Sequence, residues 1–229
     1  MSYHRNYRGT YLAFALAIFL FTVCLFVGIF WWNGRAYAKV SLEEKYYLLV
    51  QDCESTTASV VAGQIYSSGG AGYLLDTGDV VALACYFNER DAEFVQGVME
   101  EKGVETRIVE ISPEDFALNG KRAEERAHIT ANANTVDTCA RILYDTANGL
   151  ERTELTQAEA RAALTGVIKS LKGLRESNGG DVYGLWNTVL YEAERQGREV
   201  AAGILFAKDL RYIQIRLCLA ISGIGNYFS

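Results

Sequence analysis

The chain has 229 residues, of which 50% are hydrophobic and 22% are charged, so the disordered and collagen-like classes are excluded. Its net charge of −6 is unevenly distributed: four basic and no acidic residues precede Glu43, which leaves a net charge of −10 on the remainder. An acidic body repels phosphate backbones instead of releasing their counterions. We therefore expect no nucleic-acid partner.

Residues 11–32, YLAFALAIFLFTVCLFVGIFWW, contain no charge. As a helix they would extend about 33 Å, enough to cross a hydrocarbon core of roughly 30 Å. Tyr11 and Trp31-Trp32 stand where an aromatic belt lies. The small-residue motif Ala36-Tyr37-Ala38 resembles a cleavage site, but the apolar stretch is longer than a cleaved signal peptide needs. We predict an uncleaved transmembrane signal anchor.

The sequence after this segment contains two copies of one pattern, offset by 34 residues. Residues 47–75 and 81–109 align without a gap. They are identical at five of 29 positions: Leu49/Leu83, Ala58/Ala92, Val61/Val95, Gly63/Gly97 and Gly69/Gly103. Such an internal repeat predicts that both copies form the same supersecondary unit.

Each copy has the pattern of a strand, a helix and a second strand. The expected strands are 47–50, 73–75, 80–87 and 107–109, with a hairpin turn at 77–79. The expected helices begin at the polar residues 54–57 and 88–91, and they end at Gly69 and Gly103. One helix face carries Ala58, Val61 and Ile65, and its equivalent carries Ala92, Val95 and Met99. The predicted fold class is α+β, with a βαββαβ unit of ferredoxin-like or RNP-like type. Its four-stranded, mostly antiparallel sheet has both helices on one face.

This arrangement resembles the SPOR domain, the peptidoglycan-binding module of bacterial division and sporulation proteins, over residues 46–112. That family twice repeats a valine-rich strand, a Gly-x-Phe motif and an alanine that opens a helix ending in glycine. The second copy keeps Phe87, Ala92 and Gly103, and the first keeps Ala58 and Gly69. The chain departs from the pattern at Cys53, which replaces the first Phe, and at Gln51 and Cys85, which replace the glycines.

The resemblance implies binding of glycan strands stripped of stem peptides, on the sheet face that the two helices leave open. Alternation places Leu48, Val50, Ala82 and Ala84 towards the helices. It places Leu49, Gln51, Leu83, Cys85, Tyr73, Leu75, Arg107 and Val109 on the open face. The candidate glycan-binding residues are Gln51, Tyr73, Tyr86 and Arg107. Leu49 and Leu83 stand where the family often has a polar residue, and this largely apolar face is expected to be covered.

The C-terminal half changes in composition after Pro113, and helical spacing of apolar residues begins. We expect a helix over 121–148 and a second helix opened by a capping box at Thr156–Glu159. A third should run from Asp181 towards Ile221, with Gly197 and Gly203 as points of kinking or interruption. The helices form either a separate bundle or a layer that covers the apolar sheet face.

No sequence motif indicates catalysis or a cofactor. His128 follows Glu124 and Glu125, but a single Glu-x-x-His without a second nearby histidine is a poor metal site. The sequence has neither a phosphate-binding GxxxxGK[ST] loop nor a Gly-x-Ser-x-Gly elbow. After Cys24, the remaining Cys53, Cys85, Cys139 and Cys218 form no CxxC motif, and we expect buried free thiols. The chain is predicted to be no enzyme, with no catalytic residue, metal or cofactor.

Two functions are consistent with these patterns. In the first, a single-pass protein of the cell envelope binds peptidoglycan through its SPOR-like domain, in bacterial division or sporulation. In the second, a membrane-anchored, non-enzymatic scaffold interacts with an envelope or divisome protein, while its sheet face packs on its own helices or on a partner. In both, the N-terminus is cytoplasmic and the body is extracytoplasmic. The expected regions are a tail (1–10), an anchor (11–32), a linker (33–45), the SPOR-like domain (46–112) and a helical bundle (113–229).

Overall fold

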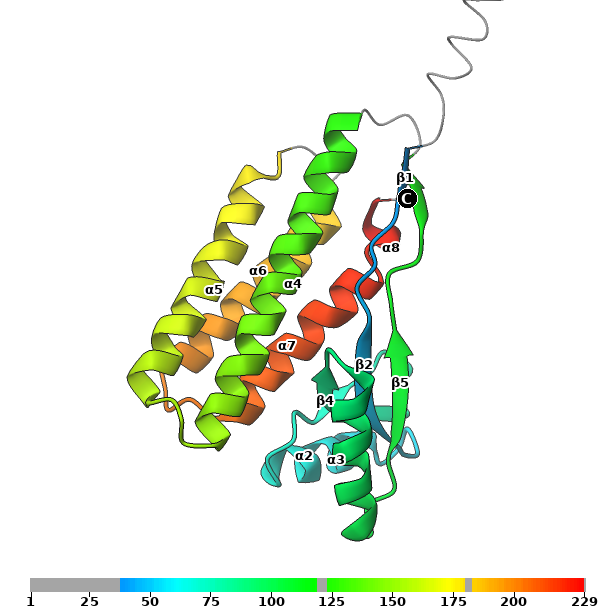
Figure 1. The fold of residues 1–229 in the computed structure, drawn as a ribbon, viewed down its shortest axis with the longest axis vertical. Helices are drawn as coiled ribbons and strands as arrows, with labels where there is room; N and C mark the ends of the chain where they lie inside the picture. Colours follow the sequence, from blue (N-terminus) through cyan, green and yellow to red (C-terminus); the bar gives the residue numbers. More distant parts are fainter. Residues whose placement is uncertain (1–37, 119–122, 180–182, 229) are drawn as a thin grey trace, which may run out of the picture.

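The computed structural model describes residues 38–118, 123–179 and 183–228. They form a four-stranded antiparallel sheet and several helices (Figure 1). The first unit contains β2 (Tyr46–Asp52), α2 (Ala58–Ser67), β3 (Tyr73–Leu74), β4 (Val80–Tyr86), α3 (Glu89–Glu101) and β5 (Arg107–Ile111). The sheet order is β3-β4-β2-β5, so in each copy of the repeat a strand of the other copy lies between the two strands. The predicted α+β class and the antiparallel sheet are confirmed.

The two copies of the repeat begin their helices differently. At α3 the predicted side-chain cap is present: Asn88 Oδ1 accepts a hydrogen bond from the backbone N–H of Arg90 at 2.9 Å. At α2 the N-cap residue Thr57 makes no such bond. Gly69 and Gly103 follow the last turns of α2 and α3 with φ of 101° and 75°, so both helices end where the sequence predicts.

The C-terminal half contains α4 (Ala123–Glu151), α5 (Gln157–Ser177), α6 (Gly184–Ala201), α7 (Ala207–Ser222) and the short α8 (Gly225–Phe228). The capping box at the start of α5 is confirmed, because Thr156 and Glu159 satisfy each other's backbone N–H groups. The expected third helix is divided into α6 and α7, and the break falls at Gly203. Gly197 does not interrupt α6. It packs against Ile168 of α5, where a Cβ atom would lie only 2.9 Å from a side-chain carbon.

The sheet lies between two layers of helices. On one face, a smaller hydrophobic cluster joins Leu49, Val81 and Leu83 to residues of α2 and α3. On the other face, a larger cluster joins Leu48 and Val50 to the apolar residues of α4 and α7. The C-terminal helices therefore cover the sheet, which is the second of the two arrangements that the sequence left open.

The predicted assignment of side chains to the two sheet faces was wrong at six positions. Leu49, Gln51 and Leu83 lie on the α2 and α3 side. Leu48, Val50 and Ala82, which were expected on that side, lie on the face covered by α4 and α7. One reason is that helices cover both faces, so no polar row marks the direction of alternation. A second reason is a bulge in β4. Leu49 pairs with Ala84 and Val50 with Ala82, so the intervening Leu83 is an extra residue. Leu83 and Ala84 therefore share one face, and the positions beyond the bulge reverse their alternation.

Two short strands lie outside the four-stranded sheet. β1 (Ala38–Val40) pairs antiparallel with β6 (Phe116–Leu118), so part of the expected linker forms a strand. Within the described part of the chain, no helix combines the length and the apolar character that crossing a membrane requires. The predicted anchor at 11–32 lies outside the described residues.

Candidate functional site

The four predicted glycan-binding residues lie on two sides of the sheet. Gln51 and Tyr86 both line a groove on the α2 and α3 side, where Tyr86 is nearly buried. Tyr73 lies on the opposite side, where the centroid of its ring is 4.8 Å from the ring centroid of Tyr212 in α7. Arg107 is exposed and makes a bidentate ion pair with Asp52 at 2.8 Å.

Two of these residues already have partners within the protein. Burial raises the pKa of the Tyr86 phenol, whose ring packs edge-on against Tyr144 of α4. The hydrogen bonds from Arg107 lower the pKa of the Asp52 carboxyl. Tyr86 is therefore a packing residue, and the charge of Arg107 is already paired.

The sheet face that the SPOR resemblance assigns to glycan is closed by the C-terminal helices. Leu48 is fully buried there, and its neighbour Cys85 in β4 is 1% exposed. The side-chain amide of Gln214 in α7 donates to the carbonyl oxygen of Cys85 at 3.0 Å. The Tyr46 hydroxyl of β2 donates to a carboxylate oxygen of Asp137 in α4 at 3.0 Å. Apolar packing and polar contacts thus join the sheet to both α4 and α7.

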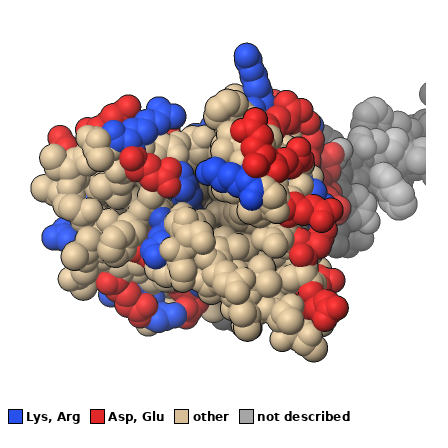
Figure 2. Space-filling view, turned by 90° about the horizontal axis from the view of Figure 1, so that it is seen from below, with Lys and Arg blue, Asp and Glu red and all other residues tan. Residues whose placement is uncertain are grey.

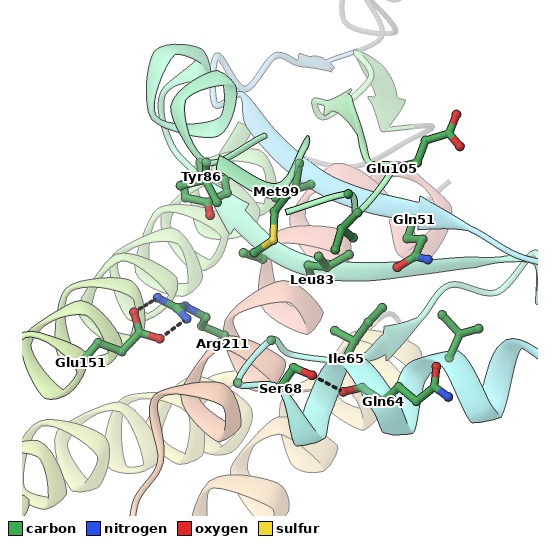
Figure 3. A pocket seen from close by; sticks show the side chains of 18 residues that line it. Gln51, Gln64, Ile65, Ser68, Leu83, Tyr86, Met99, Glu105, Glu151 and Arg211 are labelled. Atoms are coloured by element: carbon green, nitrogen blue, oxygen red, sulfur yellow. Dashed lines mark hydrogen bonds and ion pairs between the residues drawn. The ribbon is translucent and has the colours of Figure 1, made fainter. Parts of the chain in front are cut away.

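A hollow lies on the other face, between α2 and α3 (Figure 3). We call it the α2–α3 groove. It has a volume of about 680 Å³, within the range of ligand and side-chain pockets. Leu49, Leu83 and Ala84 of the sheet contribute to its floor. Its walls carry Val61 and Ile65 from α2 and Val95 and Met99 from α3.

The walls of the groove are related by the internal repeat. Val61 and Val95 are equivalent positions of the two copies, and so are Ile65 and Met99. Leu49 and Leu83 form a third pair in the floor. The helix faces predicted from the sequence are therefore those that point towards the groove and the sheet.

The two walls differ in charge. The segment 89–101 that forms α3 carries five acidic residues and one basic residue, whereas α2 carries no charged residue. Figure 2 views the molecule from the end that holds both helices. It shows acidic side chains along the right edge, mixed acidic and basic side chains on the left, and a wide surface without charged side chains at the lower right. An apolar groove beside an acidic helix results.

Polar groups stand at the two ends of the groove. At one end Arg211 of α7 forms a bidentate ion pair with Glu151 of α4 and also donates to Asn148 (Figure 3). At the other end lies Gln51, with Glu105 nearby. Because Arg211 is already paired, the groove presents no unpaired cation for an anionic ligand.

The structure describes no grouping of His, Cys, Asp and Glu side chains that could hold a metal ion within residues 38–118, 123–179 and 183–228. The Nε2 atom of His128 lies 2.9 Å from the Oδ1 atom of Asn178. The amide nitrogen of Asn178 donates to Asn132 and Asn187, which leaves Oδ1 to accept from His128. His128 is thus part of a polar network that connects α4, α5 and α6.

The groove was not predicted from the sequence. The sequence does contain a signal for it. Three pairs of equivalent positions in the two copies, Leu49/Leu83, Val61/Val95 and Ile65/Met99, are apolar, so the two helices and the sheet are expected to share one apolar surface. What the sequence could not supply was the separation of α2 from α3, which depends on how each helix packs on the sheet.

Fold and groove together define a class: an α+β protein whose sheet is covered on one face by a helical bundle and carries an apolar groove on the other. Comparisons of the chain with models of protein families, with characterised proteins and with solved structures find no match.

Proposed function

We propose that this protein is a membrane-anchored, non-enzymatic interaction module that binds a partner protein through the α2–α3 groove. The observation that carries this proposal is that the sheet face expected to bind a ligand is covered, whereas the face expected to be covered by α2 and α3 carries an open groove. The face opposite α2 and α3 is closed by α4 and α7, while the α2–α3 groove is open. Apolar side chains of the sheet and of both helices line it, together with the polar Gln64 and Ser68 of the α2 wall. The βαββαβ order supports a ferredoxin-like unit as the scaffold of the groove.

The uncharged segment 11–32 supports the anchor, since its length suffices to cross a bilayer as a helix. The body that follows is then held beside the membrane, with its N-terminal tail in the cytoplasm. A single span and one globular body suit a protein that brings a partner to the membrane.

The partner chemistry follows from the groove. Its apolar floor and walls accept large apolar side chains, and the acidic α3 beside it attracts basic side chains. A segment with apolar residues on one face and Lys or Arg on the other, bound as a helix in a groove, meets both requirements. We therefore propose a basic amphipathic segment of an envelope or divisome protein as the occupant.

Peptidoglycan is the partner that the SPOR resemblance implies. Binding on the family's sheet face would need the four candidate residues to lie together and accessible. Their separation over two faces, and the packing of α7 on that sheet face, support the interaction module instead.

The test compares two adjacent residues of α3. Val95 lines the groove, whereas the Phe94 side chain is 73% exposed and does not line it. Val95→Asp and Phe94→Asp add the same charge to the same helix turn. The full chain in detergent is titrated with a fluorescent amphipathic peptide of Leu and Lys, and with a matched peptide of Leu and Glu, and binding is measured by anisotropy.

We expect the Leu/Lys peptide to bind at least tenfold more tightly than the Leu/Glu peptide. Val95→Asp should weaken it about tenfold or more, since a carboxylate in an apolar pocket must be desolvated. Phe94→Asp should change it less than about twofold, as is usual for surface substitutions. Equal effects of the two variants would refute the groove as the binding surface. Co-sedimentation of the full chain with amidase-treated sacculi, lost in both Tyr73→Ala and Arg107→Ala, would replace the proposal by glycan binding.

A further inference from the structure

Two buried cysteines meet where the sheet contacts the C-terminal helices. Cys85 lies in β4 and is 1% exposed, and Cys218 lies in α7 and is fully buried. The two residues are 133 positions apart in the sequence. Gln214, one helical turn before Cys218, donates to the backbone carbonyl of Cys85 at 3.0 Å. The face of α7 that carries Cys218 is therefore held directly against the strand that carries Cys85.

Both side chains belong to the larger hydrophobic cluster between the sheet and the C-terminal helices. They are near enough for Cys85 to raise the pKa of the Cys218 thiol. The other described cysteines have different partners. Cys53 donates to the carbonyl oxygen of Asp79, and the Cys139 thiol of α4 is near enough to Ser170 for that side chain to affect its pKa. Cys85 and Cys218 are thus the described pair that the contact between β4 and α7 brings together.

We propose that Cys85 and Cys218 are a cross-linking site, at which a disulfide forms in an oxidising compartment and fastens α7 to the sheet. In the reaction, one thiolate attacks the S–S bond of a disulfide oxidant and gives a mixed disulfide with one half of the oxidant. The second thiolate then displaces that half. The Cys85 Sγ–Cys218 Sγ bond forms, the oxidant leaves as two thiolates, and these take up, through the solvent, the two protons that the cysteines lost.

Burial controls when this reaction occurs. Burial, and next the nearby Cys85 side chain, raise the pKa of the Cys218 thiol, so in the folded protein it is held protonated. Because the thiolate is the reacting species, folded protein reacts slowly. Oxidation is expected during folding, before α7 docks, or when α7 transiently leaves the sheet.

The cross-link would join the sheet, through β4, to the layer of C-terminal helices that covers it, through α7. It closes a long loop from β4 to α7 that includes α3, β5 and α4 to α6. Closing a long loop restricts the unfolded chain, which raises the stability of the folded state. The inference is independent of what occupies the α2–α3 groove.

The test uses the full chain, unfolded with reductant and refolded in detergent with reduced and oxidised glutathione. Free thiols are then alkylated, and the peptides are mapped by mass spectrometry. We expect a Cys85–Cys218 peptide pair, lighter by two hydrogen atoms than the two reduced peptides. The thermal midpoint should exceed that of the reduced protein by roughly 5–15 °C. Cys218→Ala should abolish both the pair and this difference, whereas Cys139→Ala, also buried, should keep both.

Recovery of Cys85 and Cys218 as alkylated thiols in folded protein would overturn the proposal. A cross-link of either residue mainly to Cys53 or Cys139 would also overturn it, as would a linked pair with no rise in thermal midpoint. If Cys218→Ala does not fold, the peptide map and the midpoints of the unmutated chain with and without reductant decide the question alone.

Discussion

Leu48→Ala tests whether the sheet and the C-terminal helices form one cooperative unit. Leu48 is fully buried on the central strand β2, where it pairs with Cys85 of β4 and Val109 of β5 and belongs to the cluster shared with α4 and α7. Truncation of a fully buried leucine costs about 2–5 kcal/mol, since apolar contacts are lost and a cavity is left. We expect a loss of about 3 kcal/mol in the free energy of unfolding.

The assay follows urea unfolding by far-ultraviolet circular dichroism, which reports mainly the helices, and by hydrogen exchange of β2 and β4 peptides. With a urea dependence of about 2–3 kcal/mol per molar, both midpoints should fall together by about 1 M or slightly more. Val60→Ala, at a side chain 62% exposed on α2, is the control and should shift neither by more than about 0.2 M. A variant whose sheet loses protection while α4 to α7 unfold at the original midpoint would refute the shared core.

Three further results are expected. Gly72→Ala should destabilise the chain more than Gly78→Ala, because both glycines have positive φ (61° and 76°) but only at Gly72 would a Cβ lie 2.4 Å from the carbonyl oxygen of Ala62. Gly78→Ala should cost about 1 kcal/mol, and equal thermal midpoints would contradict this reasoning. Burial raises the pKa of the Cys139 thiol to about 11 from an ordinary value of 9. The stability that this thiol contributes is complete below pH 9 and is lost as pH rises towards 11. Cys139→Ala should accordingly reduce the alkaline loss by about 2–3 kcal/mol between these pH values in urea titrations. Tyr46→Phe removes a buried hydroxyl bonded to a carboxylate of α4, and chemical denaturation should show a loss of about 1–3 kcal/mol.

Much of the fold could be predicted from local pattern. The four strands of the main sheet, the two helices of the repeat and the capping box at Thr156 were predicted because each depends on neighbouring residues, whereas β1 and β6 were not predicted. The end of α6 was predicted only as one of two possible breaks. Gly197 and Gly203 offer the same backbone freedom, and only tertiary packing distinguishes them. Gly197 is needed for the close approach of Ile168, whereas Gly203 lies in the turn before α7.

The candidate site could not be predicted in the same way, because it depends on the direction in which each strand residue points. Alternation gives two sets of residues but does not say which set meets which helices. The bulge at Leu83 adds a reversal that no local residue signals. As a result the glycan candidates were placed together on one open face, while the structure distributes them over two sides of the sheet.

The covering of both faces follows from the sequence whichever direction is chosen. In the structure Leu49 and Leu83 face α2 and α3, and the opposite face presents Leu48, Val50 and Ala82. In the reverse orientation the first set would face away from α2 and α3 and the second set towards them, so both faces would again be apolar. A sheet with one solvated face requires a polar set in one of the two positions. Residues 80–87 lack one, because they form an uninterrupted apolar run of the kind found in strands buried on both sides. The apolar residues at positions where SPOR domains are often polar are therefore better explained by a second helical layer than by a weakened glycan site.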